Sequence, residues 1–245
     1  MSLMFRRRRT GGAVDPLETA FAQAAWIFDP SGGHGNTFNS NSDLTNWGVG
    51  GLSAPLTFVR SGGVATVRTP GALGVANVYQ PDGSNPFDYT LGVSAPVNEI
   101  AVLMAVRSRS TGSTGSSQLY LIDTAASPAL QIRLPHSTVS GDIRLMRNGN
   151  VVTVPTLTIN STTTRVIAYY KTATVEKFMG YAGGIITTYL DQANTNTFLN
   201  AASASFGYQG QRTYAAAVFV NLGAGLISLD DLNAAGLALA EACGV

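Results

Sequence analysis

The chain has 245 residues, of which 45% are hydrophobic and only 12% are charged, about half the charged fraction of an average soluble protein. This composition excludes a disordered chain, which would have high charge and few apolar residues. The sequence has no apolar run of about 18 residues, so no membrane span is predicted. Two histidines and one cysteine are too few for a zinc site of nitrogen and sulfur ligands or for an internal disulfide.

The N-terminal segment, M-S-L-M-F-R-R-R-R-T-G-G, contains four consecutive arginines. They supply four of the 15 positive charges, so the rest of the chain carries 11 positive and 14 negative charges and is mildly acidic. Adjacent arginines repel one another and do not fold alone. We predict a basic arm over residues 1–12, with a solvated tail and weak, salt-sensitive binding to nucleic acid as the alternatives. The interpretation that we favour is an anchor that becomes ordered on an acidic surface of a partner protein. Its docking residues would be Leu3, Met4, Phe5, Arg6, Arg7, Arg8 and Arg9.

A short helix is expected to follow the arm. Asp15 and Pro16 have the pattern of an N-cap followed by proline at the first helical position, which predicts a helix over Leu17–Ala25. A strand then starts at Trp26. We expect residues 13–31 to contain this helix and this first strand.

From residue 56 onward, runs of β-branched and aromatic residues alternate with turns rich in Gly, Pro, Asn and Ser, as is typical of a sandwich or barrel. We predict an antiparallel two-sheet sandwich over residues 26–222, with the strand at 165–171 central in its sheet. The predicted strands are Leu56–Arg60, Val64–Arg68, Ala76–Gln80, Tyr89–Ser94, Glu99–Arg107, Gln118–Asp123, Ala129–Leu134, Asp142–Arg147, Val151–Val154, Arg165–Lys171, Glu176–Tyr181, Thr187–Leu190, Ala204–Gly207 and Tyr214–Asn221.

Two connections between these strands carry distinct signals. Asn148-Gly149 lies between two apolar runs and predicts a hairpin with a type I′ turn. The low-complexity segment Ser108–Ser117 separates two strongly apolar strands. We predict that this segment is the exposed tip of a long hairpin.

The C-terminal part of the chain combines a long apolar strand, Thr213–Leu222, with an amphipathic helix. Ser228 followed three residues later by Asp231 resembles a capping box. Leu229, Leu232, Gly236, Leu239 and Cys243 are spaced by three and four residues and predict one apolar helical face. We expect a closing helix over 228–243 that covers an open edge or end of a sheet, with Cys243 buried as a small apolar residue.

A final strand, a short linker and an Ala-rich helix form an ending that resembles concanavalin A-like (laminin G-like) β-sandwiches of bacteriophage virion proteins. Two further segments share this resemblance. One is L-E-T-A-F-A-Q-A-A-W-I-F-D-P-S at Leu17–Ser31, which lacks the glycines that the phage pattern has inside its helix. The other is N-S-N-S-D-L-T-N-W at residues 39–47, with Q-P-D-G-S-N at residues 80–85.

The resemblance implies an all-β jelly-roll sandwich over residues 32–245 and a non-enzymatic role in a tailed-phage virion. The position would be the tail tip, the tail fibre or the capsid surface. Expected partners are other virion proteins, further copies of the chain with a trimer favoured, and, as an open option, a host surface polysaccharide. The protein would be made in the bacterial cytoplasm and would bind neither membrane nor nucleic acid. A stand-alone carbohydrate-binding lectin-like module is the alternative.

The residues of the chain predict no catalytic site. Hydrolases of this kind need positioned carboxylates or a nucleophile with its base, and the chain has only four glutamates: Glu18, Glu99, Glu176 and Glu241. They do not form the E-x-D-x-x-E cluster of sandwich-fold glucanases. His34 and His136 lie in separate loops, and no nucleophile elbow supports either. We expect a protein without catalytic residues and without a cofactor.

Glycan contact would require exposed aromatic rings beside amide and acid groups. The aromatic candidates are Trp47, Tyr79, Phe87, Tyr89, Tyr208 and Tyr214, and the set that we favour is Trp47, Tyr79, Asp82, Asn85 and Tyr208. Most aromatic residues of a sandwich are core residues, so each is an individual hypothesis. No metal is expected. Calcium held by Asp82, Asn85 and Asp88 in one loop is the alternative to a plain turn.

Overall fold

The structure is a computed structural model in which the chain is mostly β, with antiparallel strand pairs and two helices. It describes residues 14–23, 26–28, 37–38, 44–46, 58–60, 66–69, 78–81, 87–91, 99–108, 117–124, 127–134, 141–147, 150–159, 163–193, 203–208, 213–222 and 226–245. Side chains are described mainly over residues 14–23, 99–107, 163–193 and 226–245.

The first sheet has eight strands in the order β15-β14-β13-β8-β17-β6-β5, and β1 pairs with β17 beside this path. The strands are β1 (Trp26–Phe28), β5 (Thr66–Thr69), β6 (Val78–Pro81), β8 (Ile100–Ser108), β13 (Arg165–Lys171), β14 (Val175–Ala182), β15 (Ile185–Ala193) and β17 (Thr213–Leu222). The last strand, β17, therefore lies between β8 and the early strands β1 and β6, so both ends of the chain join one sheet.

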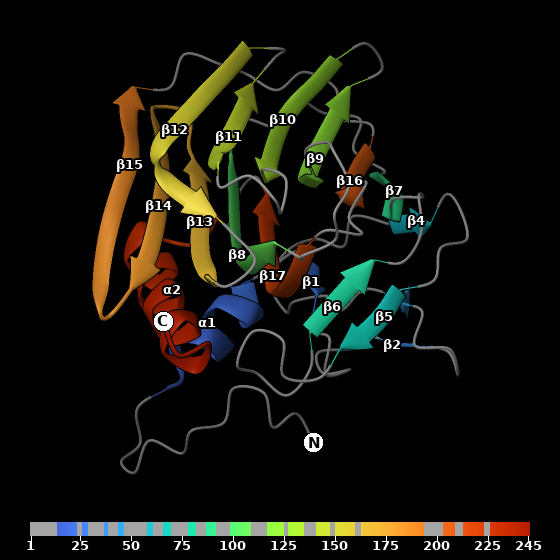
Figure 1. The fold of residues 1–245 in the computed structure, drawn as a ribbon, viewed down its shortest axis with the longest axis horizontal. Helices are drawn as coiled ribbons and strands as arrows, with labels where there is room; N and C mark the ends of the chain where they lie inside the picture. Colours follow the sequence, from blue (N-terminus) through green and yellow to red (C-terminus); the bar gives the residue numbers. More distant parts are fainter. Residues whose placement is uncertain are drawn as a thin grey trace.

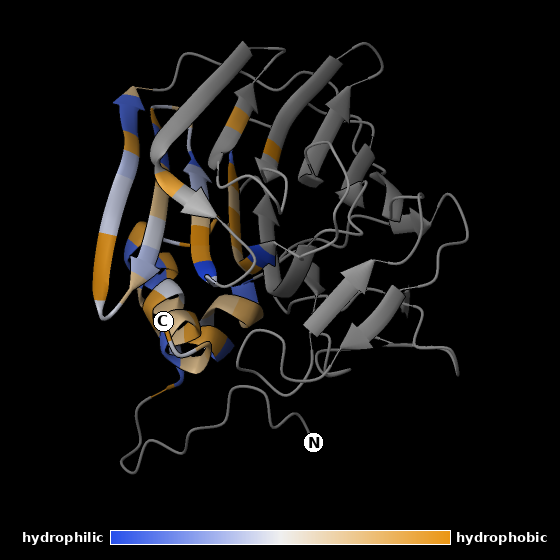
Figure 2. Cartoon of the chain, viewed as in Figure 1, coloured by the Kyte–Doolittle hydropathy of each residue, from blue (hydrophilic) through white to orange (hydrophobic). Residues whose placement is uncertain are grey.

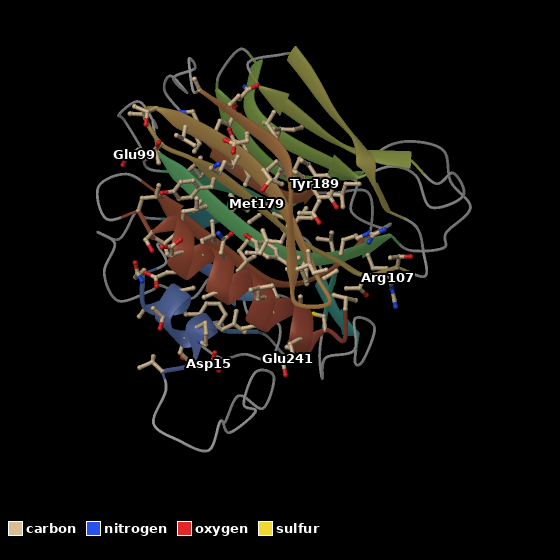
Figure 3. All side chains as sticks on the ribbon, turned by 90° about the vertical axis from the view of Figure 1, so that its left-hand side faces the viewer. Asp15, Glu99, Arg107, Met179, Tyr189 and Glu241 are labelled. Atoms are coloured by element: carbon tan, nitrogen blue, oxygen red, sulfur yellow. The ribbon has the colours of Figure 1, made fainter. Side chains whose placement is uncertain are left out.

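The second sheet has seven strands in the order β12-β11-β10-β9-β16-β7-β4, and a separate pair is formed by β2 and β3. These strands are β2 (Thr37–Phe38), β3 (Leu44–Asn46), β4 (Phe58–Arg60), β7 (Phe87–Leu91), β9 (Ser117–Thr124), β10 (Ser127–Leu134), β11 (Gly141–Arg147), β12 (Asn150–Ile159) and β16 (Ser203–Tyr208). Helices α1 (Pro16–Gln23) and α2 (Leu229–Ala242) pack on the first sheet, on the side away from the second (Figures 1 and 3).

The strands β8, β13 and β14 are buried on both faces because the helices cover one face and the second sheet the other. Successive side chains of a strand point to opposite faces. On the helix side, the core consists of Ala101, Leu103, Ala105, Val166, Ala168, Met179 and Tyr181 packed against Leu17, Ala20, Phe21, Ile227, Leu232, Ala235, Leu239, Ala240 and Cys243. On the other face, alternate residues such as Val102, Ile167 and Phe178 are equally buried. This explains why β13 shows an almost continuous run of buried residues.

Both helices begin as the sequence predicts. The backbone N–H of Leu17 donates to Asp15 Oδ1 at 2.9 Å, and that of Asp231 donates to Ser228 Oγ at 3.1 Å, so Asp15 and Ser228 cap their helices. α2 ends in a Schellman motif, because Val245 N–H bonds to Ala240 O at 3.0 Å while Gly244 adopts φ +71°. Neither described helix, of 8 and 14 residues, is long and apolar enough to cross a membrane.

The predicted face of α2 is correct, but its expected place on the sheet is not. Leu232, Gly236, Leu239 and Cys243 are all buried. They lie against the flat face of β8, β13 and β14, and not at an edge or end of a sheet. An amphipathic helix buries more apolar surface on a face than at an edge, and this favours the observed position.

All fourteen predicted strands are present: β13 has the predicted bounds, and the other thirteen differ at one or both ends. The short pair β2 and β3 was not predicted. β13 is central, as predicted, with β8 and β14 on its two sides. Asn148 and Gly149 connect β11 to β12 in a two-residue hairpin in which Arg147 pairs with Asn150. The dihedral angles of this turn lie outside the described residues.

The prediction of a long hairpin around Ser108–Ser117 is wrong. β8 pairs with β13 and β17 in the first sheet, whereas β9 pairs with β10 and β16 in the second. The connection therefore passes from one sheet to the other. Strong apolarity of two successive strands indicates that both are buried, but it does not indicate that they pair with each other.

Candidate functional site

Of the favoured glycan-binding residues, the structure describes Tyr79 and Tyr208, and only their backbone. Tyr79 lies in β6 of the first sheet and Tyr208 at the end of β16 in the second, and their side chains are not described. The remaining predicted site residues lie outside the described residues: Leu3, Met4, Phe5, Arg6, Arg7, Arg8, Arg9, Trp47, Asp82 and Asn85. His34, His136 and Asp88's side chain are likewise not described. These hypotheses stay predictions.

The described part of the chain offers a different candidate at the edge strand β15. β14 and β15 form a hairpin whose turn, Gly183-Gly184, has φ values of +56° and +76°. A type I′ turn requires positive φ at both central positions, and glycine adopts it without strain. The first four residues of β15 are exposed although the strand is paired along its length. The second sheet and the helices therefore leave this end of the strand open to solvent.

A β-bulge places Tyr189 on the face of β15 that points away from the helices. The register shifts between Phe178 and Met179, which pair with Leu190 and Thr188, so Tyr189 is the extra residue. Its ring then lies against Gly180 of β14: a Cβ built on Gly180 would be 2.8 Å from Tyr189 Cε2. Figure 3 shows Tyr189 at β15, with Met179 nearer α2. The Tyr189 ring can therefore occupy this position only because residue 180 has no Cβ.

The same face carries a buried polar network further along the hairpin. Glu176 is 0% exposed, and both of its oxygens accept hydrogen bonds. The Tyr169 hydroxyl donates to Oε1 at 2.7 Å, and the amide of the part-exposed Gln192 donates to Oε2 at 2.9 Å. Lys171, also 0% exposed, is the cross-strand partner of Glu176 on β13. The network fixes the position of the Gln192 amide beside Tyr189.

The two lysines of the chain, Lys171 and Lys177, both lie on the β13–β14 hairpin but on opposite faces. Lys177 forms an ion pair of 2.5 Å with Asp191 on the helix side, where the aspartate side chain is 59% exposed. A surface ion pair of this kind is worth about 0–1 kcal/mol. We therefore assign it to the stability of the edge pairing and not to the candidate site.

Three polar or aromatic side chains thus share one face at the open edge: Thr187, Tyr189 and Gln192, which we name the β15 edge face. Thr187 offers a hydroxyl, Tyr189 a ring and a hydroxyl, and Gln192 an amide. Figure 2 shows that β15 is hydrophobic at the end near the turn and hydrophilic towards its other end. Such a surface suits a ligand with apolar C–H groups and many hydroxyls. Among the described residues, no group of three His, Cys, Asp or Glu side chains could hold a metal ion.

The glutamates that the sequence analysis weighed as catalytic have separate environments. Glu176 is enclosed in the network and does not reach solvent, whereas Glu99 is part-exposed just before β8. Burial raises the pKa of Tyr170, and the negative charge of Glu99 raises it further. A solvated substrate cannot contact the carboxylate of Glu176 in this fold.

Comparison with known proteins finds likeness at the level of fold. No protein-family description and no curated protein matches the sequence. Among solved structures, a sialidase from Trypanosoma rangeli in complex with sialic acid has a TM-score of 0.54 at 8% identity, covering 89% of this chain and 33% of the sialidase. Domain 4 of the extracellular GH43 arabinanase AbnA from Geobacillus stearothermophilus, with arabinotriose, has a TM-score of 0.47 at 14% identity, covering 74% and 88% of the two chains.

A third match is the exoplasmic/lumenal domain of VIP36 with Ca²⁺ and Man3GlcNAc, with a TM-score of 0.43 at 11% identity, covering 72% of this chain and 87% of that domain. At these identities the likeness shows the fold alone, and of the three matches only the sialidase has a TM-score above 0.5. None of the three is a virion protein. The chain spans one third of the sialidase, so the activity of that protein does not transfer to it.

Proposed function

We propose that this chain is a carbohydrate-binding module with a concanavalin A-like sandwich, and that it binds its glycan at the β15 edge face. The observation that carries the proposal is the Tyr189 ring, fixed by Gly180 at an open sheet edge beside Thr187 and Gln192. A sugar presents an apolar C–H face and a rim of hydroxyls. An aromatic ring that contacts the first, with hydroxyl and amide groups that contact the second, is the arrangement that recognises such a ligand.

The Gln192 amide supports specificity because its orientation is set before a ligand arrives. The amide nitrogen of Gln192 donates to the buried Glu176, and this hydrogen bond sets the orientation of the amide group. A donor or acceptor that is already positioned loses little conformational freedom on binding. Thr187 and Gln192 are five residues apart, about 15 Å along a strand, which favours an oligosaccharide over a single sugar.

Binding without hydrolysis is the better supported activity. Both oxygens of Glu176 are occupied inside the fold, so this carboxylate orients Gln192 and does not act as an acid or nucleophile. In most glycoside hydrolase families, hydrolysis uses two carboxylates on either side of the scissile bond. The β15 edge face contains hydroxyl, phenol and amide groups instead.

The test is binding of the protein and three variants to an array of defined oligosaccharides that includes arabinotriose, sialylated glycans and Man3GlcNAc. Tyr189→Ala should weaken binding at least about tenfold, as for an aromatic contact in the centre of an interface, while Tyr189→Phe should retain most of it. Thr187→Ala should weaken binding, and Thr188→Ala on the opposite face of the same strand should not. Equal affinities for the Thr187 and Thr188 variants, or full binding by Tyr189→Ala, would refute the assignment.

A virion structural role is the second candidate, located in the phage particle and made in the bacterial cytoplasm. One described feature favours it, namely the final strand β17 followed by the capped, Ala-rich helix α2, as the phage resemblance implies. The reading frames on either side of this one would test it. Tail, baseplate or capsid neighbours would support a particle protein, and neighbours devoted to glycan degradation would contradict it.

A further inference from the structure

A shallow groove of about 490 Å³ lies on the outer surface of the helix layer, which we define as residues 14–23 and 226–245. The groove is bounded by the start of α1, the β14–β15 turn and the C-terminal half of α2. Its lining is apolar apart from one carboxylate: Pro16, Gly183, Gly184, Ala234, Leu237, Ala238, Glu241 and Val245. An exposed apolar side chain lies at its α1 end, because Val14, two residues before Pro16 of the lining, is 73% exposed.

Every charged side chain of the helix layer is acidic. It contains five carboxylates and not one lysine, arginine or histidine. The carboxylates are Asp15, Glu18, Asp230, Asp231 and Glu241. Figure 3 shows Asp15 and Glu241 on the outer side of the two helices, away from both sheets. An apolar groove in an acidic surface fits a segment with adjacent apolar and basic side chains, since apolar groups bury in the groove while cations lie over its rim.

One segment of this chain has that chemistry, and it is connected to the groove. Leu3, Met4 and Phe5 are directly followed by Arg6–Arg9, and the chain reaches the described residues at Val14, two residues before Pro16 in the groove lining. The nine residues from Phe5 to Val14 span up to about 30 Å when extended. Leu3–Arg9, about 23 Å extended, matches the length of α2, about 21 Å. Gly11-Gly12 supplies the point at which the chain can reverse direction.

We propose that the arm of this chain docks on its own helix layer, with Leu3–Phe5 in the groove and Arg6–Arg9 over the acidic rim that includes Glu241. A tethered segment acts at an effective concentration in the millimolar range. At micromolar protein concentration, docking within one chain therefore outcompetes the same contact made by a second copy. The groove is then the acidic surface that the arginines of the arm require, and it lies on the chain itself.

Disulfide trapping in the full-length chain tests the proposal. The variant Met4→Cys with Ala238→Cys places one thiol in the arm and one in the groove. The control, Met4→Cys with Ala173→Cys, places the second thiol at the β13–β14 turn, at the far end of β14 from the groove. The native Cys243 is only 6% exposed, and burial raises its pKa to about 12, so it stays unreactive in both variants. Mild oxidation of micromolar protein is followed by mass spectrometry of the monomer and dimer fractions.

The expected result is an intramolecular disulfide in the monomer that forms at least about tenfold faster for the Ala238 variant than for the Ala173 control. Adding Glu241→Lys should slow it about two- to fivefold, as for loss of an exposed ion pair. Glu99→Lys, which reverses a charge far from the groove in Figure 3, should not. Rates equal to the control, a disulfide found only between two chains, or equal effects of the two charge reversals would each overturn the proposal.

Discussion

Replacing Gly236 by alanine should destabilise the protein, although alanine is the better helix former. Gly236 is buried in the middle of α2, and the ring of Tyr181 from β14 lies directly against its Cα. A Cβ at this position would be 2.5 Å from Tyr181 Cζ and 2.6 Å from both Cε atoms. The ring is held in place by the hydrogen bond from its hydroxyl to Asn233 Oδ1, 3.0 Å long. The added methyl group must therefore displace either the ring or the helix.

The magnitude follows from three opposing contributions. Alanine gains about 0.8–1 kcal/mol of helix propensity over glycine. Overpacking a close-packed core costs about 1–3 kcal/mol. Moving the ring weakens a part-buried hydrogen bond worth about 1 kcal/mol. We expect Gly236→Ala to lower the free energy of unfolding by about 1–3 kcal/mol.

Urea denaturation measures this change as a lower midpoint with an unchanged m-value. The decisive control is the same substitution in a Tyr181→Ala background, where the obstructing ring is gone. There Gly236→Ala should stabilise the protein by about 0.5–1 kcal/mol, because only the propensity gain remains. If Gly236→Ala destabilises the protein equally in both backgrounds, contact with Tyr181 is not the cause and the reasoning is refuted.

Two further predictions concern buried groups on the same part of the fold. Burial raises the pKa of Cys243 to about 12 from its ordinary value of 9.0. The contribution of the buried thiol to stability is therefore complete below pH 9 and is lost as the pH rises from 9 towards 12. At pH 8, Ellman's reagent should modify the native thiol only as fast as the protein opens. Glu176→Ala should lower the free energy of unfolding by about 3 kcal/mol or more in urea, because Tyr169 loses its acceptor and Lys171 its buried carboxylate neighbour; a loss below about 1 kcal/mol would contradict the network.

The elements predicted correctly from the sequence are those that depend on local signals. Ser228 with Asp231, and Asp15 with Pro16, mark helix starts because capping involves residues only two or three positions apart. β12 shows where a local rule misleads. The predicted strand ended at Val154, directly before a proline, which cannot donate to a ladder, yet β12 continues through Pro155. It is an edge strand with a register irregularity at this point, where a missing N–H costs little.

Pairing between distant strands could not be predicted in the same way. The apolar patterns of β8 and β9 indicate that each strand is buried. They fit equally well an arrangement in which the two strands pair as a hairpin and one in which they lie in two separate sheets. What separates them is the return of β17 between β8 and β6, a contact across more than a hundred residues. The same holds for α2, whose apolar face is readable from its spacing, whereas the sheet face that it covers is set by β8, β13 and β14.

The β15 edge face escaped the sequence analysis for a related reason. Tyr189 stood within a predicted strand that ended at Leu190, and strict alternation would have assigned its side chain to the opposite face from Leu190. The bulge breaks this alternation, and it becomes visible only when β15 is aligned with β14. From the sequence, Gly180 is only a glycine that weakens a strand. Its role becomes clear from the structure, in which the Tyr189 ring packs against it. One glycine and one bulge thus turn an edge of the sheet into a surface with a fixed aromatic ring, while Met179 and Tyr181 on the other face of the same hairpin pack in the core against α2.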